Sequence, residues 1–220
     1  MIDTWADTEA ACVGRLWAES GPGKEAVPLS SWLLTICDPS VAESVAEAFR
    51  TAEPRTSEDG DGFEVVLSGD TVTVVVTELA TAVNRMVLGE GPKAHICDGE
   101  QFLEPGADAS RPCGCAGELS DRKARARAGE GPTPDCRLVF RLATAPELGS
   151  FCFVSSSWEF ALSLRSLMAE TDDGAPATVD LIRRISRMTT RSGIQVTFTA
   201  LLALPVRADS IDQSTVKLAV

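Results

Sequence analysis

Several features on which common activities depend are missing from this sequence. His95 is its only histidine, so a Ser-His-Asp triad could be built around that residue alone. There is no Gly-x-Ser-x-Gly nucleophile elbow and no His-Glu-x-x-His metal pair. The Gly-Glu-Gly-Pro segments at 89–92 and 129–132 carry a glutamate that would repel phosphate, and both lack the Lys-Ser/Thr ending of a phosphate-binding loop. We therefore expect that the protein is not an enzyme.

Positive charge and long apolar runs are also scarce. The chain has 20 Lys+Arg against 32 Asp+Glu, which gives a formal net charge of −12. Its average surface therefore repels phosphate backbones and anionic lipid heads, and we expect neither strong direct DNA binding nor membrane association. The first residues have no signal-peptide pattern, and apolar runs such as 200–206 are too short to span a bilayer. These observations favour a cytoplasmic protein.

What the sequence does have is a group of cysteines in an unusual setting. Residues 89–136 are rich in glycine and proline, and the stretch is too long for an unsupported loop in a compact domain. Thiolates that bind a metal ion can order such a segment where apolar burial cannot. The prediction is a structural zinc site with four cysteine ligands: Cys97, Cys113, Cys115 and Cys136.

The spacing leaves the ligand set open. Glycine in the Cys-Gly-Cys triplet at 113–115 permits a tight turn that lets both sulfurs face one ion. His95 is an alternative to Cys136 as fourth ligand, because it lies two residues before Cys97 and both would share one side of a strand. Loop thiols without a metal are a further alternative. Four protein ligands would close the coordination shell, whereas three would leave room for an activated water and make hydrolysis possible.

The other cysteines lie among apolar neighbours. Seven cysteines in a chain with no export signal indicate reduced thiols or metal ligands rather than a disulfide scaffold. We interpret three of them as buried small hydrophobic residues: Cys12, Cys37 and Cys152.

Hydrophobic periodicity and turn signals predict an α+β fold, an antiparallel β-sheet with packed helices and a Cys-rich, zinc-stabilised insert. Strands are expected at 28–36, 63–67, 72–76, 83–88, 137–143, 150–154, 178–188 and 194–206. The strands on either side of Ser68-Gly69-Asp70 read as a hairpin, and 83–88 would complete a meander. Helices are expected at 4–19, after Asp38-Pro39, around 120–128 with Ser120 as cap, and from a capping box at 156–159. The last of these is apolar nearly all round, which indicates a central buried helix.

These elements suggest a simple domain organisation. We expect an N-terminal helical arm at 1–24, a single α+β domain at 25–208 that contains the 89–136 insert, and a C-terminal tail at 209–220.

Two groups of basic residues stand out in this acidic chain. The short helix in the insert carries Arg122, Lys123, Arg125 and Arg127, which could contact DNA phosphates or an acidic protein surface, or could be a solvated helix face. The second group is interpreted as the solvent-facing edge of a strand and turn: Arg183, Arg184, Arg187 and Arg191.

A series of short motifs in the insert and beyond it resembles a known family. The motifs are His95-Ile96-Cys97-Asp98-Gly99, Arg111-Pro112-Cys113-Gly114-Cys115, Asp121-Arg122-Lys123, Gly131-Pro132-Thr133-Pro134, Phe140-Arg141-Leu142-Ala143, Leu148-Gly149-Ser150-Phe151 and Ser156-Ser157-Trp158. In this order, and over about residues 28–206, the chain resembles the recombination directionality factors of actinomycetes and their phages. The Cys-Asp-Gly and Cys-Gly-Cys elements match best, whereas Cys136 has no assured place in the family pattern.

The resemblance implies a non-enzymatic regulator of DNA recombination. Such a protein binds a DNA-bound large serine integrase and redirects it toward phage excision, the recombination of attL with attR, through a protein–protein interaction. An acidic protein can act in this way without gripping DNA, provided that it binds two integrase arrangements unequally. Two functions of other classes remain as alternatives, a zinc-dependent hydrolase or nuclease and a zinc-stabilised nucleic-acid-binding module that uses the basic helix.

Overall fold

The computed structural model describes residues 11–20, 27–57, 60, 62–76, 83–89, 94–103, 109–170, 176–189, 193 and 195–206. These residues form a mixed α+β fold, as the sequence predicted, with an eleven-stranded sheet and three α-helices. The expected C-terminal tail and the first ten residues lie outside the described residues. The strands are β1 Gly14–Ser20, β2 Val27–Ile36, β3 Arg55–Thr56, β4 Phe63–Leu67, β5 Thr71–Val76, β6 Val83–Leu88, β7 His95–Cys97, β8 Thr133–Leu142, β9 Phe151–Ser155, β10 Ala177–Thr189 and β11 Gln195–Pro205. The helices are α2 Pro39–Phe49, α3 Leu119–Arg127 and α4 Trp158–Glu170.

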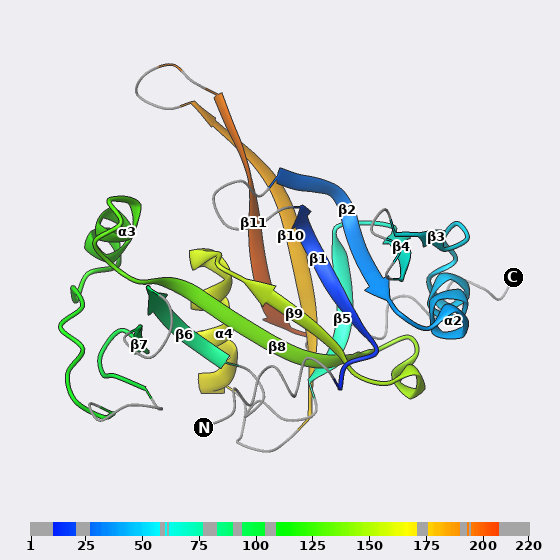
Figure 1. Cartoon of the computed structure of the whole chain (residues 1–220), viewed down its shortest axis with the longest axis horizontal. Coiled ribbons are helices and arrows are strands. Elements are labelled where there is room, and N and C mark those ends of the chain that lie inside the picture. Colours follow the sequence, from blue (N-terminus) through cyan, green and yellow to red (C-terminus); the bar gives the residue numbers. More distant parts are fainter. Residues whose placement is uncertain are drawn as a thin grey trace, which may run out of the picture.

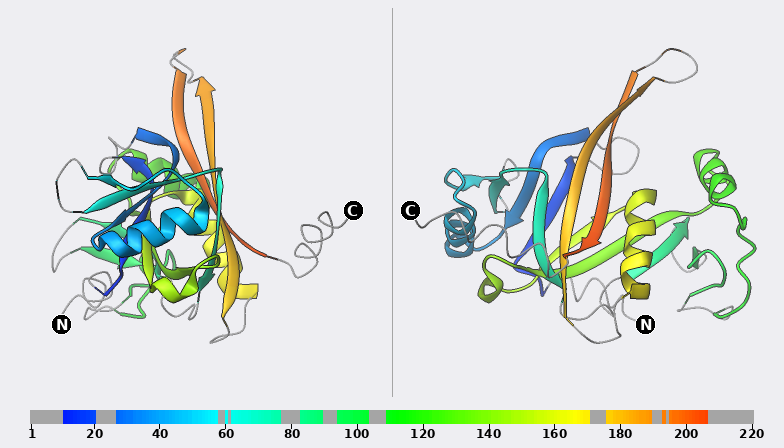
Figure 2. Two further views of the ribbon diagram at one scale, coloured as in Figure 1. Left: turned by 90° about the vertical axis from the view of Figure 1, so that its right-hand side faces the viewer. Right: turned by 180° about the vertical axis from the view of Figure 1, so that it is seen from behind.

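The strands run in the order β11-β10-β5-β8-β9-β1-β2-β4-β3, and β6 pairs with β8 and β7 beside this path. Every pairing is antiparallel except that of β1 with β9, which is parallel. The sheet is strongly curled, so that β11 contacts β2 across it (Figure 1). The insert with β6, β7 and α3 lies at one end of the molecule and α2 at the other (Figures 1 and 2).

The main core forms inside the curled sheet because the strands alternate inward apolar and outward polar residues. Two helices complete it, since α2 packs against β4 and β2 while α4 packs against β11 and β8. Aromatic rings fill its centre: Phe153 meets Trp32 and Phe160 edge to face, with ring centroids 5.6 and 5.2 Å apart. Leu162 on α4 is 43% exposed, so this helix buries one side rather than its whole circumference.

The first described segment corrects the predicted N-terminal helix. Residues 14–20 are the strand β1, which lies between β2 and β9 near the middle of the sheet. Leu16 and Ala18 are buried and alternate with less buried neighbours, which is the two-residue period of a strand. Trp17 faces the other way and donates from Nε1 to Thr35 Oγ1 at 3.0 Å. The prediction of a helix was wrong because adjacent apolar residues such as Leu16 and Trp17 can share one face of a helix. In the strand they lie on opposite faces of the sheet.

The predicted hairpin and meander are also wrong, although all three strands exist. β4 pairs with β2 and β3, while β5 pairs with β10 and β8. The turn at Ser68-Gly69-Asp70 therefore carries the chain across the curled sheet instead of folding it back on itself. β6 then pairs with β8 rather than with β5. Alternation specifies a strand and its buried face, but it does not specify the neighbouring strand.

The helix starts follow local capping chemistry. Asp38 caps α2, since its Oδ1 accepts hydrogen bonds from the backbone N–H of Ser40 at 2.8 Å and of Val41 at 3.3 Å. The hydrogen bond from the Ser40 hydroxyl at 2.6 Å, together with these two, lowers the pKa of its carboxyl. At α4 the cap is Ser157, whose hydroxyl accepts from the Phe160 N–H at 3.3 Å, one residue later than the expected capping box. At α3 the cap position is Glu118 rather than Ser120.

A buried arginine joins the two halves of the curled sheet. Arg183 on β10 is 1% exposed and donates to the carbonyl oxygens of Leu29 at 2.6 Å and Ser30 at 2.8 Å, both on β2. It also forms a 2.6 Å ion pair with Asp70, whose carbonyl accepts from Trp32 Nε1 at 3.1 Å. The sequence-based interpretation of Arg183 as a solvent-facing residue is therefore wrong, whereas Arg184 and Arg187 are exposed. Arg191 lies outside the described residues.

This geometry predicts a large stability loss for Arg183→Met. The substitution leaves two strand carbonyls without their charged donor, and we expect the free energy of unfolding to fall by about 3 kcal/mol. Urea denaturation of the purified protein measures the change. The neighbouring exposed Arg184→Met serves as control and should shift stability by less than about 0.5 kcal/mol. Equal effects of the two substitutions would contradict the role of the buried guanidinium.

Candidate metal centre

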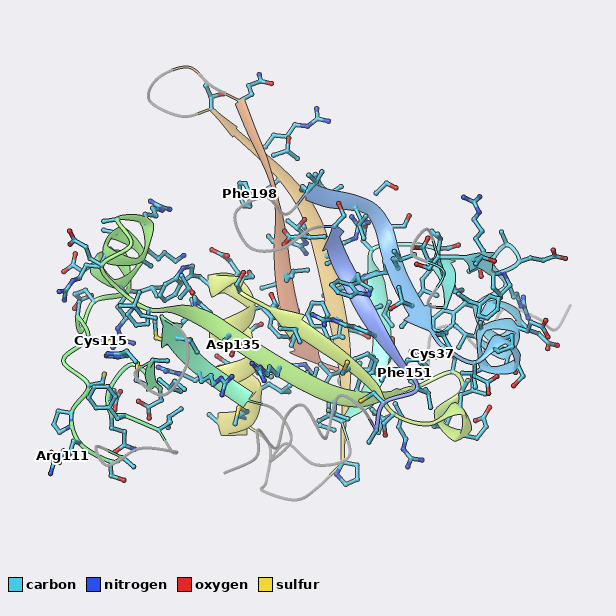
Figure 3. The ribbon with its side chains drawn as sticks, viewed as in Figure 1. Cys37, Arg111, Cys115, Asp135, Phe151 and Phe198 are labelled. Carbon is cyan, nitrogen blue, oxygen red and sulfur yellow. The ribbon has the colours of Figure 1, made fainter. Side chains whose placement is uncertain are left out.

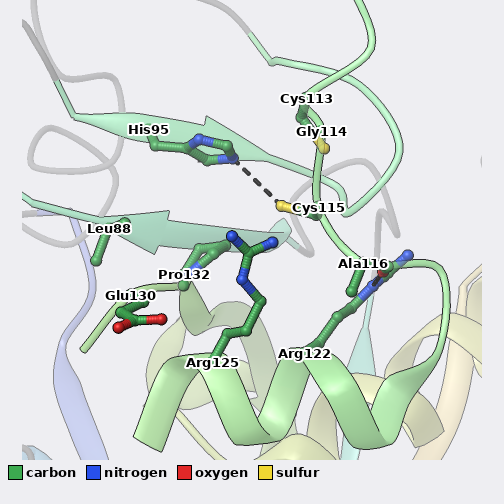
Figure 4. Close-up of a pocket in the computed structure, with 11 residues that line it drawn as sticks. Leu88, His95, Cys113, Gly114, Cys115, Ala116, Arg122, Arg125, Glu130 and Pro132 are labelled. Carbon is green, nitrogen blue, oxygen red and sulfur yellow. Dashed lines mark hydrogen bonds between the residues drawn. The ribbon is translucent and has the colours of Figure 1, made fainter. Parts of the chain in front are cut away.

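Four side chains of the insert converge on one point. The nearest ligand atoms of His95, Cys97, Cys113 and Cys115 all lie within 4.8 Å of one another. The Sγ atoms of Cys97 and Cys115 are 3.7 Å apart, and Cys115 Sγ lies 3.4 Å from His95 Nε2. Figure 4 shows the imidazole of His95 directed at the Cys115 sulfur across the gap between β7 and the cysteine loop. The four residues could hold a metal ion.

The two short separations fit tetrahedral coordination. Zinc binds thiolate sulfur at about 2.3 Å and imidazole nitrogen at about 2.0–2.1 Å, so the edges of a regular tetrahedron are about 3.8 Å between two sulfurs and about 3.5 Å between sulfur and nitrogen. The observed 3.7 and 3.4 Å are within about 0.2 Å of these values. Three sulfurs and one nitrogen are also the donor set of a common class of structural zinc sites.

Local backbone geometry explains how the ligands meet. His95 and Cys97 are alternate residues of β7 and so share one side of the strand, as expected. The chain then turns sharply, because Asp98 Oδ1 accepts from the N–H groups of Glu100 and Gln101, both at 2.8 Å. The N–H of Gly99 donates to the Cys97 sulfur. The other two ligands come from the Cys-Gly-Cys triplet, whose glycine has the positive φ of +71° that the tight turn requires.

The described residues of the insert form only a small buried cluster of their own. Its buried cluster consists of Met86, Cys97 and Cys113, with Phe102, Cys115 and Trp158 partly buried around it. This cluster is separate from the main core. Two of its three fully buried members are candidate metal ligands. Apolar burial alone therefore provides little energy to order residues 94–116.

Burial changes the acid–base properties of the candidate ligands. Desolvation is the main cause that raises the pKa of the thiols of Cys97 and Cys115, and it lowers the pKa of the His95 imidazolium. Near neutral pH the imidazole is therefore a neutral donor, while these thiols are protonated until a cation displaces their protons. The His95 ring also packs on Phe102, with ring centroids 4.7 Å apart, which fixes its orientation.

Long side chains from two helices hold the cluster against the body of the protein. Arg122 of α3 donates from Nε to the carbonyl of Ala116, next to the last cysteine ligand, and a Cβ at Gly99 would collide with its guanidinium. Lys123 pairs with Glu159 of α4 at 3.1 Å. Arg165, also on α4, donates to the Asp98 carbonyl at 2.8 Å. Sequence reasoning missed Arg165 because nothing local to α4 indicates a contact across 67 positions.

A cavity of about 190 Å³ opens beside the cluster, between the metal-ligand loop and α3 (Figure 4). His95, Cys113 and Cys115 line one wall, and Arg122 and Arg125 line the wall formed by the helix. The cavity contains positive side chains near the candidate ligands, but Glu130 also lines it and offsets part of that charge.

Cys136, the expected fourth ligand, is not part of the cluster. It lies on β8, is fully buried and belongs to the main core. Burial, and to a smaller extent the nearby Asp135 carboxylate, raises the pKa of its thiol to about 12. His95 is the fourth member of the cluster instead, because β8 turns the Cys136 side chain toward the core of the curled sheet. Among the other cysteines, Cys152 is buried as predicted, Cys12 is half-buried and Cys37 is exposed.

Comparisons with known proteins add no assignment at this point. No protein-family model and no solved structure matches the chain. Within the part of the chain that the structure describes, no helix has both the length and the apolar character needed to cross a membrane.

The geometry predicts one metal ion per chain, bound by these four residues. Substituting Cys97, Cys113 or Cys115 by Ser, or His95 by Ala, should weaken binding of Zn²⁺ by more than about 100-fold, beyond the effect of losing an outer-sphere partner. Cys136→Ala should leave the stoichiometry unchanged. Competition with a chromophoric chelator measures affinity, and Co²⁺ substitution gives the visible spectrum of a tetrahedral thiolate site. If Cys136→Ala loses the metal while His95→Ala keeps it, the fourth ligand is Cys136, as the sequence predicted, and not His95.

Metal removal should loosen the insert selectively. Because the cluster is separate from the main core, chelation should speed amide hydrogen exchange in residues 94–116 by at least about tenfold and leave β8 and β9 unchanged. Hydrogen exchange with mass spectrometry, with and without chelator, makes the comparison. Uniform protection in both states would show that the insert does not need the ion.

Proposed function

We propose that the protein is a cytoplasmic, non-enzymatic regulator whose insert is stabilised by one structural Zn²⁺, and that it binds a large serine integrase and favours excision over integration. One observation carries this proposal: motifs that bear the resemblance to recombination directionality factors meet at one place. Cys97-Asp98-Gly99, Cys113-Gly114-Cys115 and Asp121-Arg122-Lys123 are distant in sequence, yet they build the same cluster and its support.

The bound ion would cross-link β7 to the cysteine loop. Cys97 and His95 would supply the ligands from the strand, and Cys113 and Cys115 those from the loop. Arg122 holds the segment that follows the last ligand through the Ala116 carbonyl, and Arg165 ties the preceding turn to α4. These contacts give a rigid surface from a segment that lacks a core of its own, and rigidity lowers the entropy cost of binding a partner.

The ligand set argues against a zinc-dependent hydrolase. Three thiolates and one imidazole would fill the four positions of a tetrahedral zinc ion with protein ligands. A hydrolytic site needs an open position at which water is bound and activated. The sole histidine is used as a ligand, so it cannot also serve as a general base at this site.

The basic helix is a weak argument for a nucleic-acid-binding module. Two of its four basic residues are engaged within the protein, Arg122 with the Ala116 carbonyl and Lys123 with Glu159. Arg125 and Arg127 remain exposed. With a net charge of −12, two exposed arginines give little affinity for duplex DNA at physiological salt.

The energy required of such a regulator is modest. Reversing a 99:1 preference between two integrase arrangements needs about 5.5 kcal/mol of differential affinity. An ordinary protein–protein interface of about 1,600 Å² can supply this difference. The protein needs no catalytic group and no grip on DNA to act in this way, provided that it binds one arrangement better than the other.

An in vitro recombination assay tests the proposal. With the large serine integrase encoded beside this protein, wild-type protein should stimulate attL × attR recombination and inhibit attP × attB recombination. Cys115→Ser, which lacks one ligand, should lose most of this effect, whereas Cys136→Ala should retain it. If product direction is the same with and without wild-type protein, the proposal is wrong. Chelator-sensitive hydrolysis of nucleic acid by the purified protein would favour the hydrolase instead.

A further inference from the structure

The strands β10 and β11 continue well beyond the sheet to which they belong. β5 pairs with β10 only from Ala177 to Ile182, while the β10–β11 ladder runs on to Thr189 and Gln195. Figures 1 and 2 show this two-stranded ribbon rising from the body in all three views. From Arg184 to Thr189 the ribbon is about 20 Å long at the usual rise of a strand. We call residues 184–189 and 195–200 the ribbon.

The ribbon is anchored firmly where it leaves the sheet. Arg183, the last residue before it, is the buried arginine that binds the carbonyls of Leu29 and Ser30 and the carboxylate of Asp70. The Arg183 backbone N–H also donates to the Asp70 carbonyl at 2.8 Å. A two-stranded ribbon alone is marginal in water, so this anchor matters for its order. A pre-organised projection of this kind is suited to contact another molecule.

The free edge of the ribbon lacks the usual protection against pairing. β11 is the end strand of the sheet order and contains no charged residue from Gln195 to Pro205. Natural edge strands are normally blunted by charges, bulges or proline within the strand. Near the body the edge is covered, because the Ala203 N–H donates to Ser163 Oγ of α4 at 2.9 Å. This bond also shows that the Ala203 backbone points away from β10.

The same orientation applies further out along β11. In an antiparallel ladder, alternate residues direct both backbone groups to the same side, so Thr199 and Thr197 also point away from β10. Thr199 is buried, whereas Thr197 is exposed. Among the described residues, no strand pairs with this side of β11. Phe198 on the outer face of the ribbon is 37% exposed, and Ile185 on its inner face is 46% exposed. Figure 3 shows Phe198 standing clear of the body of the sheet.

The charge of this region is opposite to that of the protein. Between Asp180 and Asp209 the sequence has arginines and no acidic residue, in a chain of net charge −12. Arg184 lies on the outer face, paired across the ladder with Ala200, and Arg187 lies on the inner face, paired with Thr197. Both are exposed. A partner segment beside β11 would therefore meet an apolar strip with positive charge on either side.

From these observations we infer that the ribbon is the partner-binding surface, where an extended protein segment with apolar and acidic residues adds as a strand to the edge of β11. Main-chain hydrogen bonds to the exposed Thr197 would supply affinity, and Phe198, Arg184 and Arg187 would select the segment. Phosphate groups of a nucleic acid could pair with the arginines. They would not pair with the backbone of the uncharged strand edge or cover the exposed apolar side chains of Phe198 and Ile185. The inference rests on the proposed function, in which that segment belongs to the integrase.

Two variants test the edge and the charge separately. Thr197→Pro removes one outward backbone N–H and should weaken integrase binding about tenfold. This is the effect expected when one hydrogen bond to the partner strand is lost and the proline disturbs the strand locally. Arg184→Glu with Arg187→Glu should weaken it by at least about tenfold through charge reversal. The matched control is Arg50→Glu with Arg55→Glu, which makes the same charge change at two exposed sites, the C-cap of α2 and the strand β3. Zinc content and thermal melting of every variant confirm that the fold is intact.

Photo-crosslinking identifies what touches the ribbon. A photoreactive benzoylphenylalanine in place of Phe198 should form an adduct with the integrase in the complex on attL and attR DNA. An adduct with DNA alone, or no adduct, would overturn the inference. So would ribbon variants that bind integrase and stimulate excision as well as the control does. If the ribbon variants behave like the control and the wild-type protein stimulates excision, only the inference about the ribbon is wrong. If the wild-type protein itself does not change the direction of recombination, both the proposed function and the inference are wrong.

Discussion

The convergence of four side chains in the insert is the constraint on which the order of this end of the molecule depends. From β6 to β8 the described residues bury one small cluster apart from the main core, and two of its three buried side chains, Cys97 and Cys113, are candidate metal ligands. Three thiols and an imidazole lie within 4.8 Å of one another, and coordination of a metal ion by them is the proposed source of the order that burial does not supply. Arg122 and Arg165 both donate to backbone carbonyls next to the candidate ligands, so these two hydrogen bonds can form only when the cluster is ordered. The proposed ion and the two helices thus form one cooperative unit.

The body of the protein uses a polar contact in a comparable way. Its sheet is curled rather than closed, and β10 and β2 meet across the curl without a hydrogen-bonded ladder. Arg183 fills this position by binding two carbonyls of β2 and the Asp70 turn with one planar guanidinium. Such a fork suits several acceptors at fixed positions, which a flexible lysine ammonium would satisfy less well. The contact also fixes the direction in which β10 and β11 leave the sheet.

Local chemistry in the sequence predicted much of the fold and only part of the site. The alternation in β2, β8 and β11 gave correct strands, and Asp38-Pro39 gave a correct helix start, because these signals act between near neighbours. Strand partners were not predictable, since β4 and β5 have equally good apolar faces toward any neighbour. The same limit applied to the ligands. Spacing alone placed His95 and Cys97 on one side of a strand, but the choice of His95 over Cys136 depends on which way β8 faces in the assembled sheet.

The arrangement suggests how an acidic protein can act on a DNA-bound partner without competing for the DNA. A net charge of −12 keeps most of the surface away from phosphate, while exposed arginines are placed on two projections, the insert helix and the ribbon. Figure 1 shows two separate projections, the ribbon rising from the sheet and the insert at one end of the molecule, so one protein could engage two separate parts of a partner. Two rigidly spaced contacts discriminate between partner arrangements better than one, because an arrangement with the wrong spacing satisfies only one of them. Discrimination of this kind needs rigid spacing rather than strong binding at either contact, and the arginine anchor of the ribbon and the metal-ligand cluster of the insert both provide rigidity.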